Sequence, residues 1–183
     1  MRAPARSGRR GILGLAALSL AAPVLAACGL RPLYATRADG TAGAAEQGLS
    51  EVNVPLLPER TGQLLRQALQ ARFDPGNIGR ARRYDLAVGL NISSDVQGID
   101  QATSAPSRQR LVGIATWRLV ALDPQRSTLA NGVARSADGL NLFDQQFFAQ
   151  DLESEAVQRR IVDAVADQIT MQLAAYFKRT AGD

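Results

Sequence analysis

The sequence of 183 residues contains no histidine, one cysteine (Cys28) and one lysine (Lys178). Without an imidazole, histidine-based metal sites and the Ser-His-Asp and Cys-His catalytic groups are excluded. A single cysteine cannot form a disulfide within the chain. Neither of the glycine-rich phosphate-binding patterns, G-x-x-x-x-G-K and G-x-G-x-x-G, is present. These absences favour a protein that is not an enzyme and that uses no cofactor and no metal.

Carboxylates are the remaining candidates for catalysis. Asp138, Asp144 and Asp151 lie in the C-terminal third of the chain and could serve a carboxylate-based glycan enzyme. No carboxylate pair stands at a recognisable motif spacing. Of the three functional hypotheses that the sequence allows, a carboxylate-based glycan enzyme is therefore the weakest.

The first 27 residues have the parts of a secretory signal. Four arginines precede an apolar stretch over 11–22, which is shorter than the roughly 20 residues of a membrane-spanning helix. The junction Leu25-Ala26-Ala27-Cys28 resembles a bacterial lipobox. We expect residues 1–27 to be a lipoprotein signal peptide and Cys28 to carry acyl chains such as palmitate, each buried methylene adding about 0.8 kcal/mol of anchoring. The alternative is an uncleaved anchor in which Cys28 is incidental.

Cleavage at this junction changes the charge of the protein. The whole chain has 21 basic and 17 acidic residues, a net charge of +4. Residues 1–27 hold four of the basic residues and no acidic one, so 17 of each sign remain. The charge of the mature chain gives no reason to expect a nucleic-acid partner.

The rest of the chain has the length of one domain. Residues 28–48 read as a lipidated N-terminus followed by a small, polar, flexible linker over 35–48. Residues 49–179 read as the domain itself, and a polar stretch over 97–109 reads as the loop of a long hairpin. The expected elements are a short edge strand over 49–57, a helix over 60–73, strands over 84–93, 110–122 and 127–137, and a helix over 152–177.

The order β-α-β-β-β-α predicts an α+β fold: a two-layer sandwich with two helices on one face of a four-stranded, largely antiparallel sheet. The last helix carries an apolar row with a spacing of four residues. The row consists of Val157, Ile161, Val165, Ile169, Leu173 and Phe177. This stripe is expected in the core, where it covers the sheet, and the alternative is a face for a partner or a membrane surface.

The segment around Cys28 carries a family resemblance. It reads Leu-Ala-Ala-Cys-Gly-Leu-Arg-Pro-Leu-Tyr over residues 25–34. It resembles the mature start of the LPS-assembly lipoprotein family of LptE type, especially its alphaproteobacterial members, which commonly read Cys-Gly-Phe-Arg-Pro-Leu-Tyr. This chain has Leu30 where phenylalanine is usual. The expected order of elements is also that of the family.

The resemblance implies a lipid-anchored, periplasm-facing protein of the cell outer membrane. Members bind and plug an outer-membrane β-barrel LPS-assembly protein, assist the assembly of lipopolysaccharide at the cell surface, and contact lipopolysaccharide through basic residues. Arg108 and Arg110 are candidates for that contact, because arginine forks bind phosphate bidentately, and the alternative is that both are solvated charges. A different small periplasmic lipoprotein, such as a secretion-pore pilot or a peptidoglycan-synthase activator, is the second functional hypothesis.

Overall fold

The computed structural model divides the chain into two units, Met1–Pro32 and Leu33–Asp183. The residues it describes are 42–74, 81–101, 104, 106–142 and 147–182, all in the second unit. Their elements, in order, are α2 (Ala44–Ser50), β1 (Val52–Asn53), α3 (Glu59–Phe73), β2 (Tyr84–Ile99), β3 (Pro106–Ala121), β4 (Thr128–Asn141) and α4 (Phe147–Thr180).

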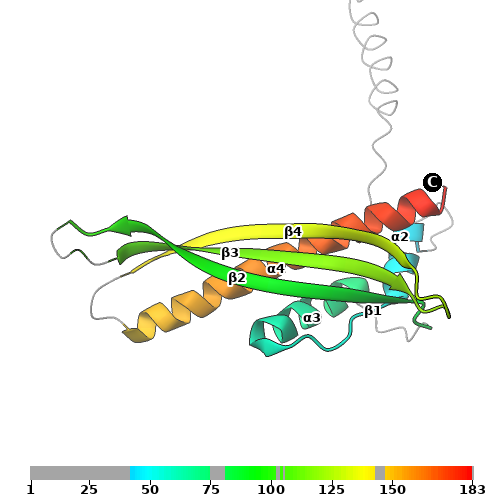
Figure 1. Cartoon of the computed structure of the whole chain (residues 1–183), viewed down its shortest axis with the longest axis horizontal. Coiled ribbons are helices and arrows are strands. Elements are labelled where there is room, and N and C mark those ends of the chain that lie inside the picture. Colours follow the sequence, from blue (N-terminus) through cyan, green and yellow to red (C-terminus); the bar gives the residue numbers. More distant parts are fainter. Residues whose placement is uncertain (1–41, 75–80, 102–103, 105, 143–146, 183) are drawn as a thin grey trace, which may run out of the picture. The chain divides into compact units, whose positions relative to one another are not determined.

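The four strands form one sheet in the order β1-β2-β3-β4. The short β1 runs parallel to β2, and the other neighbours are antiparallel. The helices α3 and α4 pack on one face of this sheet (Figure 1). The predicted α+β two-layer sandwich and its β-α-β-β-β-α order are thus confirmed, with α2 as an additional element before β1.

The core lies between the sheet and the helices, and α4 contributes a large part of it. All six residues of the apolar row on α4 are buried, as the sequence predicts. On β3 the buried side chains alternate along the strand from Leu111 through Ala115 and Trp117 to Leu119. Gly113 belongs to the same face, and a Cβ there would overlap a methyl group of Ile161. The absence of a side chain at this position lets α4 lie close to the sheet.

The predicted linker is wrong for residues 44–48. They form most of α2, in which Ala45 and Leu49 are 3% and 2% exposed. Gly48 faces the ring of Phe177 near the end of α4, closely enough that a Cβ would overlap the ring. Small residues suit a flexible linker in composition, but here they allow close helix packing. Residues 35–41 of the predicted linker lie outside the described residues.

The predicted hairpin loop over 97–109 is also wrong in extent. The strand β2 continues to Ile99 and β3 begins at Pro106, so both ends of that stretch belong to strands. Most side chains there are exposed or half-buried. Polar residues suit a two-stranded ribbon that is solvated on both faces, and the pairing of its backbones holds it together.

Candidate functional site

The face of the sheet away from the helices is open. On β3 the residues between the buried ones point to this face, and so do their partners in the antiparallel register on β2 and β4. The face carries four arginines, Arg108, Arg110, Arg118 and Arg135. Arg135 joins the three on β3 because it lies opposite Ile114.

The four open-face arginines are exposed, and none has an ion pair or a side-chain hydrogen bond to another described residue. Two carboxylates share the face with them. Asp85 is engaged by Asn53 at 2.8 Å and by Arg126 at 2.9 Å. Asp95 lies opposite Arg110 in the register without forming an ion pair with it. Positive charge therefore exceeds negative charge on this face.

Arginines on the helices behave differently. Arg72 on α3 donates to Asp167 at 2.6 Å and lies 3.6 Å from Asp163, and these contacts raise the pKa of its guanidinium, the hydrogen bond to Asp167 contributing most. Arg160 on α4 binds Asp138 at 2.6 Å. That hydrogen bond and a second from the Gly139 backbone N–H lower the pKa of Asp138. These arginines join elements of the fold and are not available to a ligand.

Apolar side chains lie among the arginines of the open face. Ile114 and Val133 are 39% and 57% exposed, and Val112 is half-buried. A surface that alternates guanidinium groups with aliphatic side chains suits an amphiphile that has anionic groups beside hydrocarbon. It also suits a protein surface of the same mixed character.

Arg108 and Arg110, the candidates from the sequence, both lie on strand β3. Arg110 was predicted at the start of this strand, whereas Arg108 was predicted in the loop before it. Arg118 and Arg135 were missed by sequence reasoning. The alternation of Arg110, Val112, Ile114, Thr116 and Arg118 would have placed Arg118 on the same face as Arg110. Arg135 needed the register of β3 with β4, which the sequence does not reveal.

Two carboxylates of the enzyme hypothesis, Asp138 and Asp151, lie on different elements of the fold. Asp138 on β4 is bound to Arg160. Asp151 on α4 lines a surface hollow together with Arg60 and Arg159. Asp144 and Cys28 lie outside the described residues. Among those residues no three His, Cys, Asp or Glu side chains gather in a way that could hold a metal ion.

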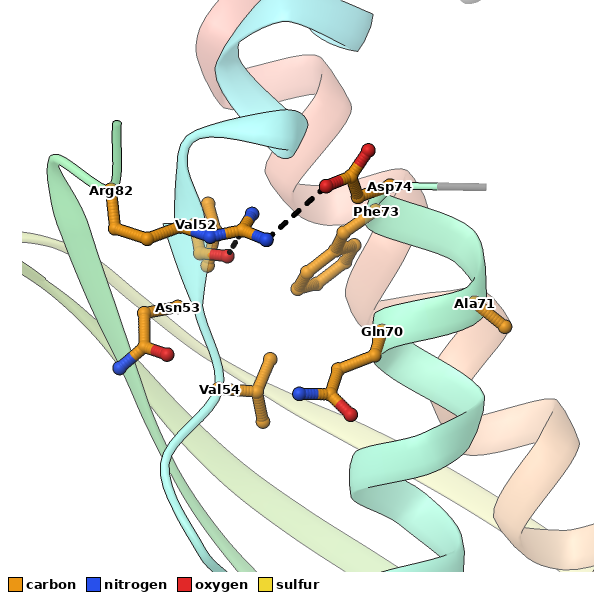
Figure 2. Close-up of a pocket in the computed structure, with 8 residues that line it drawn as sticks. All are labelled: Val52, Asn53, Val54, Gln70, Ala71, Phe73, Asp74 and Arg82. Atoms are coloured by element: carbon orange, nitrogen blue, oxygen red, sulfur yellow. Dashed lines mark hydrogen bonds and ion pairs between the residues drawn. The ribbon is translucent and has the colours of Figure 1, made fainter. Parts of the chain in front are cut away.

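A further hollow, of about 340 Å³, lies beside β1 and the end of α3. Figure 2 shows the side chain of Arg82 reaching across it between the two elements. Its guanidinium donates to the backbone oxygens of Ser50 at 2.6 Å and Val52 at 3.3 Å, and it binds Asp74 at 3.2 Å. Arg82 thereby fixes the start of the sheet to the C-terminal end of α3, which is a structural role.

Comparison with known proteins identifies the family. The family model LptE, described as lipopolysaccharide-assembly, matches residues 49–173. The chain belongs to the LptE family. No curated protein matches this LptE family member in sequence. No helix among its described residues has both the length and the apolar character needed to cross a membrane.

Solved structures share the fold of this LptE family member. A crystal structure of a lipoprotein from Caulobacter crescentus CB15 is 23% identical, with a TM-score of 0.58, and the match covers 77% of this chain and 100% of that one. Lipoprotein B from Nitrosomonas europaea is 18% identical with a TM-score of 0.51, over 72% and 83% of the two chains. The rare lipoprotein B from Shewanella oneidensis is 12% identical with a TM-score of 0.52, over 72% and 97%.

Proposed function

We propose that this protein is a non-catalytic lipoprotein of the outer membrane that binds and plugs a β-barrel translocon and assists lipopolysaccharide assembly at the cell surface. Acyl chains on Cys28 anchor it, and its folded part faces the periplasm. Membership of the LptE family supports the role in lipopolysaccharide assembly. The lipobox-like segment supports the anchor.

The observation that carries the lipopolysaccharide contact is the open face, whose four arginines have no ion-pair partner among the described residues. Phosphate groups of lipopolysaccharide are matched by guanidinium forks, which donate two parallel hydrogen bonds to a phosphate. The exposed aliphatic residues between the arginines, Ile114 and Val133 above all, suit the acyl chains. On this proposal Arg108 and Arg110 act together with Arg118 and Arg135.

Binding of purified lipopolysaccharide tests this face. Replacing Arg118 and Arg135 by Ala should weaken binding several-fold, since an exposed charge contact contributes about 1 kcal/mol or less. The loss should shrink as salt is raised. Arg108→Ala with Arg110→Ala should act in the same direction. Unchanged affinity of both double variants at low salt would remove the open face from the site.

A matched control is available on the helix side. Arg60 and Arg159 have side chains that are 71% and 58% exposed, and both bind Glu155. Their double alanine variant removes the same charge from the protein but from the covered side of the sheet. It should bind lipopolysaccharide as the unmodified protein does.

Anchoring and partner binding are tested in cells. Cys28→Ser should abolish labelling by radioactive fatty acid and release the protein from the outer-membrane fraction. Depletion of the protein should lower both the yield of correctly assembled barrel and the amount of surface lipopolysaccharide. If depletion left both unchanged, the secretion-pore pilot or the synthase activator would become the better hypothesis.

A further inference from the structure

The strand β2 has a long unpaired edge. On the side away from β3 the only described strand beside it is β1, which pairs with Tyr84 and Asp85. Beyond Leu86 no described strand lies against this side of β2. An exposed strand edge offers backbone donors and acceptors to another chain.

The hydrogen-bond pattern shows which residues offer those groups. The N–H of Tyr84 donates toward β1, to the Glu51 oxygen at 3.3 Å. Its partner Ala121 donates away from β2, to the Ser127 oxygen at 3.0 Å. Tyr84 and Ala121 therefore do not bond to each other, and alternate residues of β2 from Tyr84 onward point to the free side. The parallel pairing of Asn53 with Asp85 uses the N–H of Leu86, which faces β1. The free N–H groups therefore belong to Val88, Leu90, Ile92 and Ser94.

Side chains bond to part of each of the other two edges of the sheet. At β1, Arg82 donates to the Val52 oxygen (Figure 2) and to the Ser50 oxygen, and Arg66 donates to the Val54 oxygen at 3.1 Å. These arginines satisfy the carbonyls that a neighbouring strand would otherwise bond.

At β4 the cover comes from α4. The carboxamide of Gln168 accepts from the N–H of Arg135 at 3.0 Å and donates to its oxygen at 2.9 Å. A strand would make the same two bonds. Gln172 donates to the Val133 oxygen at 3.0 Å and accepts from the indole of Trp117 at 2.8 Å.

No described side chain makes such bonds to the free groups of residues 88–94. A groove of about 440 Å³ runs beside this edge on the helix side. It is lined by residues 90–94 of β2 and by polar side chains of the helices, Thr61 on α3 and Ser154 and Gln158 on α4. Glu59 is the one charged residue of the lining, and it has no ion pair with a described residue.

We infer that residues 88–94 of β2 bind an extended segment of a partner protein as an added strand, with a lysine or arginine of that segment beside Glu59. Alternate side chains of the added strand enter the groove, where small polar residues match its lining. A second copy of β2 fits poorly, because Asp85 and Asp95 are its only charged residues and neither complements Glu59.

The partner meant here is the barrel protein of the proposed function, and to that extent the inference rests on that function. Ser94→Pro is the sharpest test, because it removes a free N–H and places a ring on the open edge without breaking the pairing with β3. Ser94→Ala is the matched control, since it keeps the N–H. The barrel, purified in detergent, should bind the proline variant about tenfold or more weakly than the control. Glu59→Lys should weaken binding as well.

Amide hydrogen exchange gives an independent measurement on the unmodified protein. In the free protein the amides of residues 88, 90, 92 and 94 should exchange faster than those of their neighbours at 87, 89, 91 and 93. In the purified complex with the barrel the two sets should exchange at similar, slow rates. Equal barrel binding by the proline and alanine variants, or exchange on β2 unchanged by the barrel, would overturn the inference while leaving the proposed function standing. Failure of the unmodified protein to bind any barrel would overturn both.

Discussion

The two faces of the sheet use the same residue type for different purposes. On the helix-covered side, arginine side chains such as Arg72 and Arg160 end on carboxylates of a neighbouring element. On the open side, Arg118 and Arg135 end in solvent without such a partner among the described residues. After position 27 the chain has equal numbers of acidic and basic residues. One face of the sheet can still be positive, because the carboxylates are concentrated on the other face, where they pair with arginines. Net charge alone would hide this distribution.

The largest effect should come from the covered face. Ile169 on α4 is fully buried, and Ile169→Asp places an unpaired charge in the core, which should cost several kcal/mol and unfold the protein. Met171 lies on the same helix and is 50% exposed, so Met171→Asp should melt close to the unmodified protein. Thermal unfolding followed by circular dichroism compares the two. A cooperative transition for Ile169→Asp at the original temperature would show that the stripe faces water or a partner.

Two glycines on adjacent strands compare the faces directly. A methyl group at Gly113 would overlap Ile161, whereas one at Gly89 would only touch the Thr116 hydroxyl at 3.6 Å. Gly113→Ala should therefore destabilise the fold by about 1–3 kcal/mol, as overpacking does. Gly89→Ala should be neutral or slightly stabilising, because it restricts the unfolded chain. Urea unfolding of both variants gives the difference, and equal midpoints would mean that α4 does not press on β3.

The two classes of arginine should separate in a stability measurement. Arg72→Ala removes contacts to two carboxylates and to the Ala68 oxygen, and we expect a loss of about 1 kcal/mol. Arg118→Ala removes no contact of this kind and should change stability by less than about 0.5 kcal/mol. Lipopolysaccharide affinity should show the reverse order. A variant of Arg118 that loses stability as Arg72 does would make it a structural residue.

The smallest expected effect concerns acid stability. The pKa of Asp138 is lowered in the fold by Arg160 and by the Gly139 N–H. A carboxyl group with a lowered folded pKa adds stability above its unfolded pKa, near pH 4, and loses it as the pH falls through the folded value. Asp138→Asn should therefore be slightly less stable at pH 7, and its stability should fall less than that of the unmodified protein below pH 4. The measurement is the free energy of unfolding of both proteins as a function of pH. If it changed with pH in the same way for both, Asp138 would make no contribution to acid stability.

The parts of the fold that the sequence predicts are those in which apolar residues recur with a clear helical or strand period. The burial of the row from Val157 to Phe177 can be predicted from the sequence, because one stripe of α4 is apolar and the rest is polar. The ribbon beyond Val96 has no such signal, since both of its faces are solvated and its polar residues read as a loop. The helix α2 could not be predicted either. Ala45 and Gly48 are small residues, which suggest a linker in the sequence but allow close packing in the fold.

The candidate site shows the same limit. The family resemblance at residues 25–34 was visible in the sequence and agrees with the family model over residues 49–173. Arg108 and Arg110 could be named because they are close together in sequence. Which face of β3 is covered could not be decided, since Val112 and Ile114 are as apolar as Leu111 and Leu119. Only the register across the strands brings Arg135 to the others.

The carboxamide of Gln168 makes the two bonds that a neighbouring strand would make to β4. This contact affects how many copies of the protein can associate through their sheet edges. Polymerisation through sheet edges requires two free edges on each subunit. One edge joins the growing filament, and the other must remain free to bind the next subunit. Within the described residues the long free edge lies on β2, whereas Gln168 and Gln172 occupy the middle of the β4 edge at Arg135 and Val133. Occupation of the β2 edge, by a foreign segment or by a second copy, leaves only an interrupted edge on β4 for a further subunit. An interrupted edge disfavours the growth of a filament, which matters for a protein held at high local density.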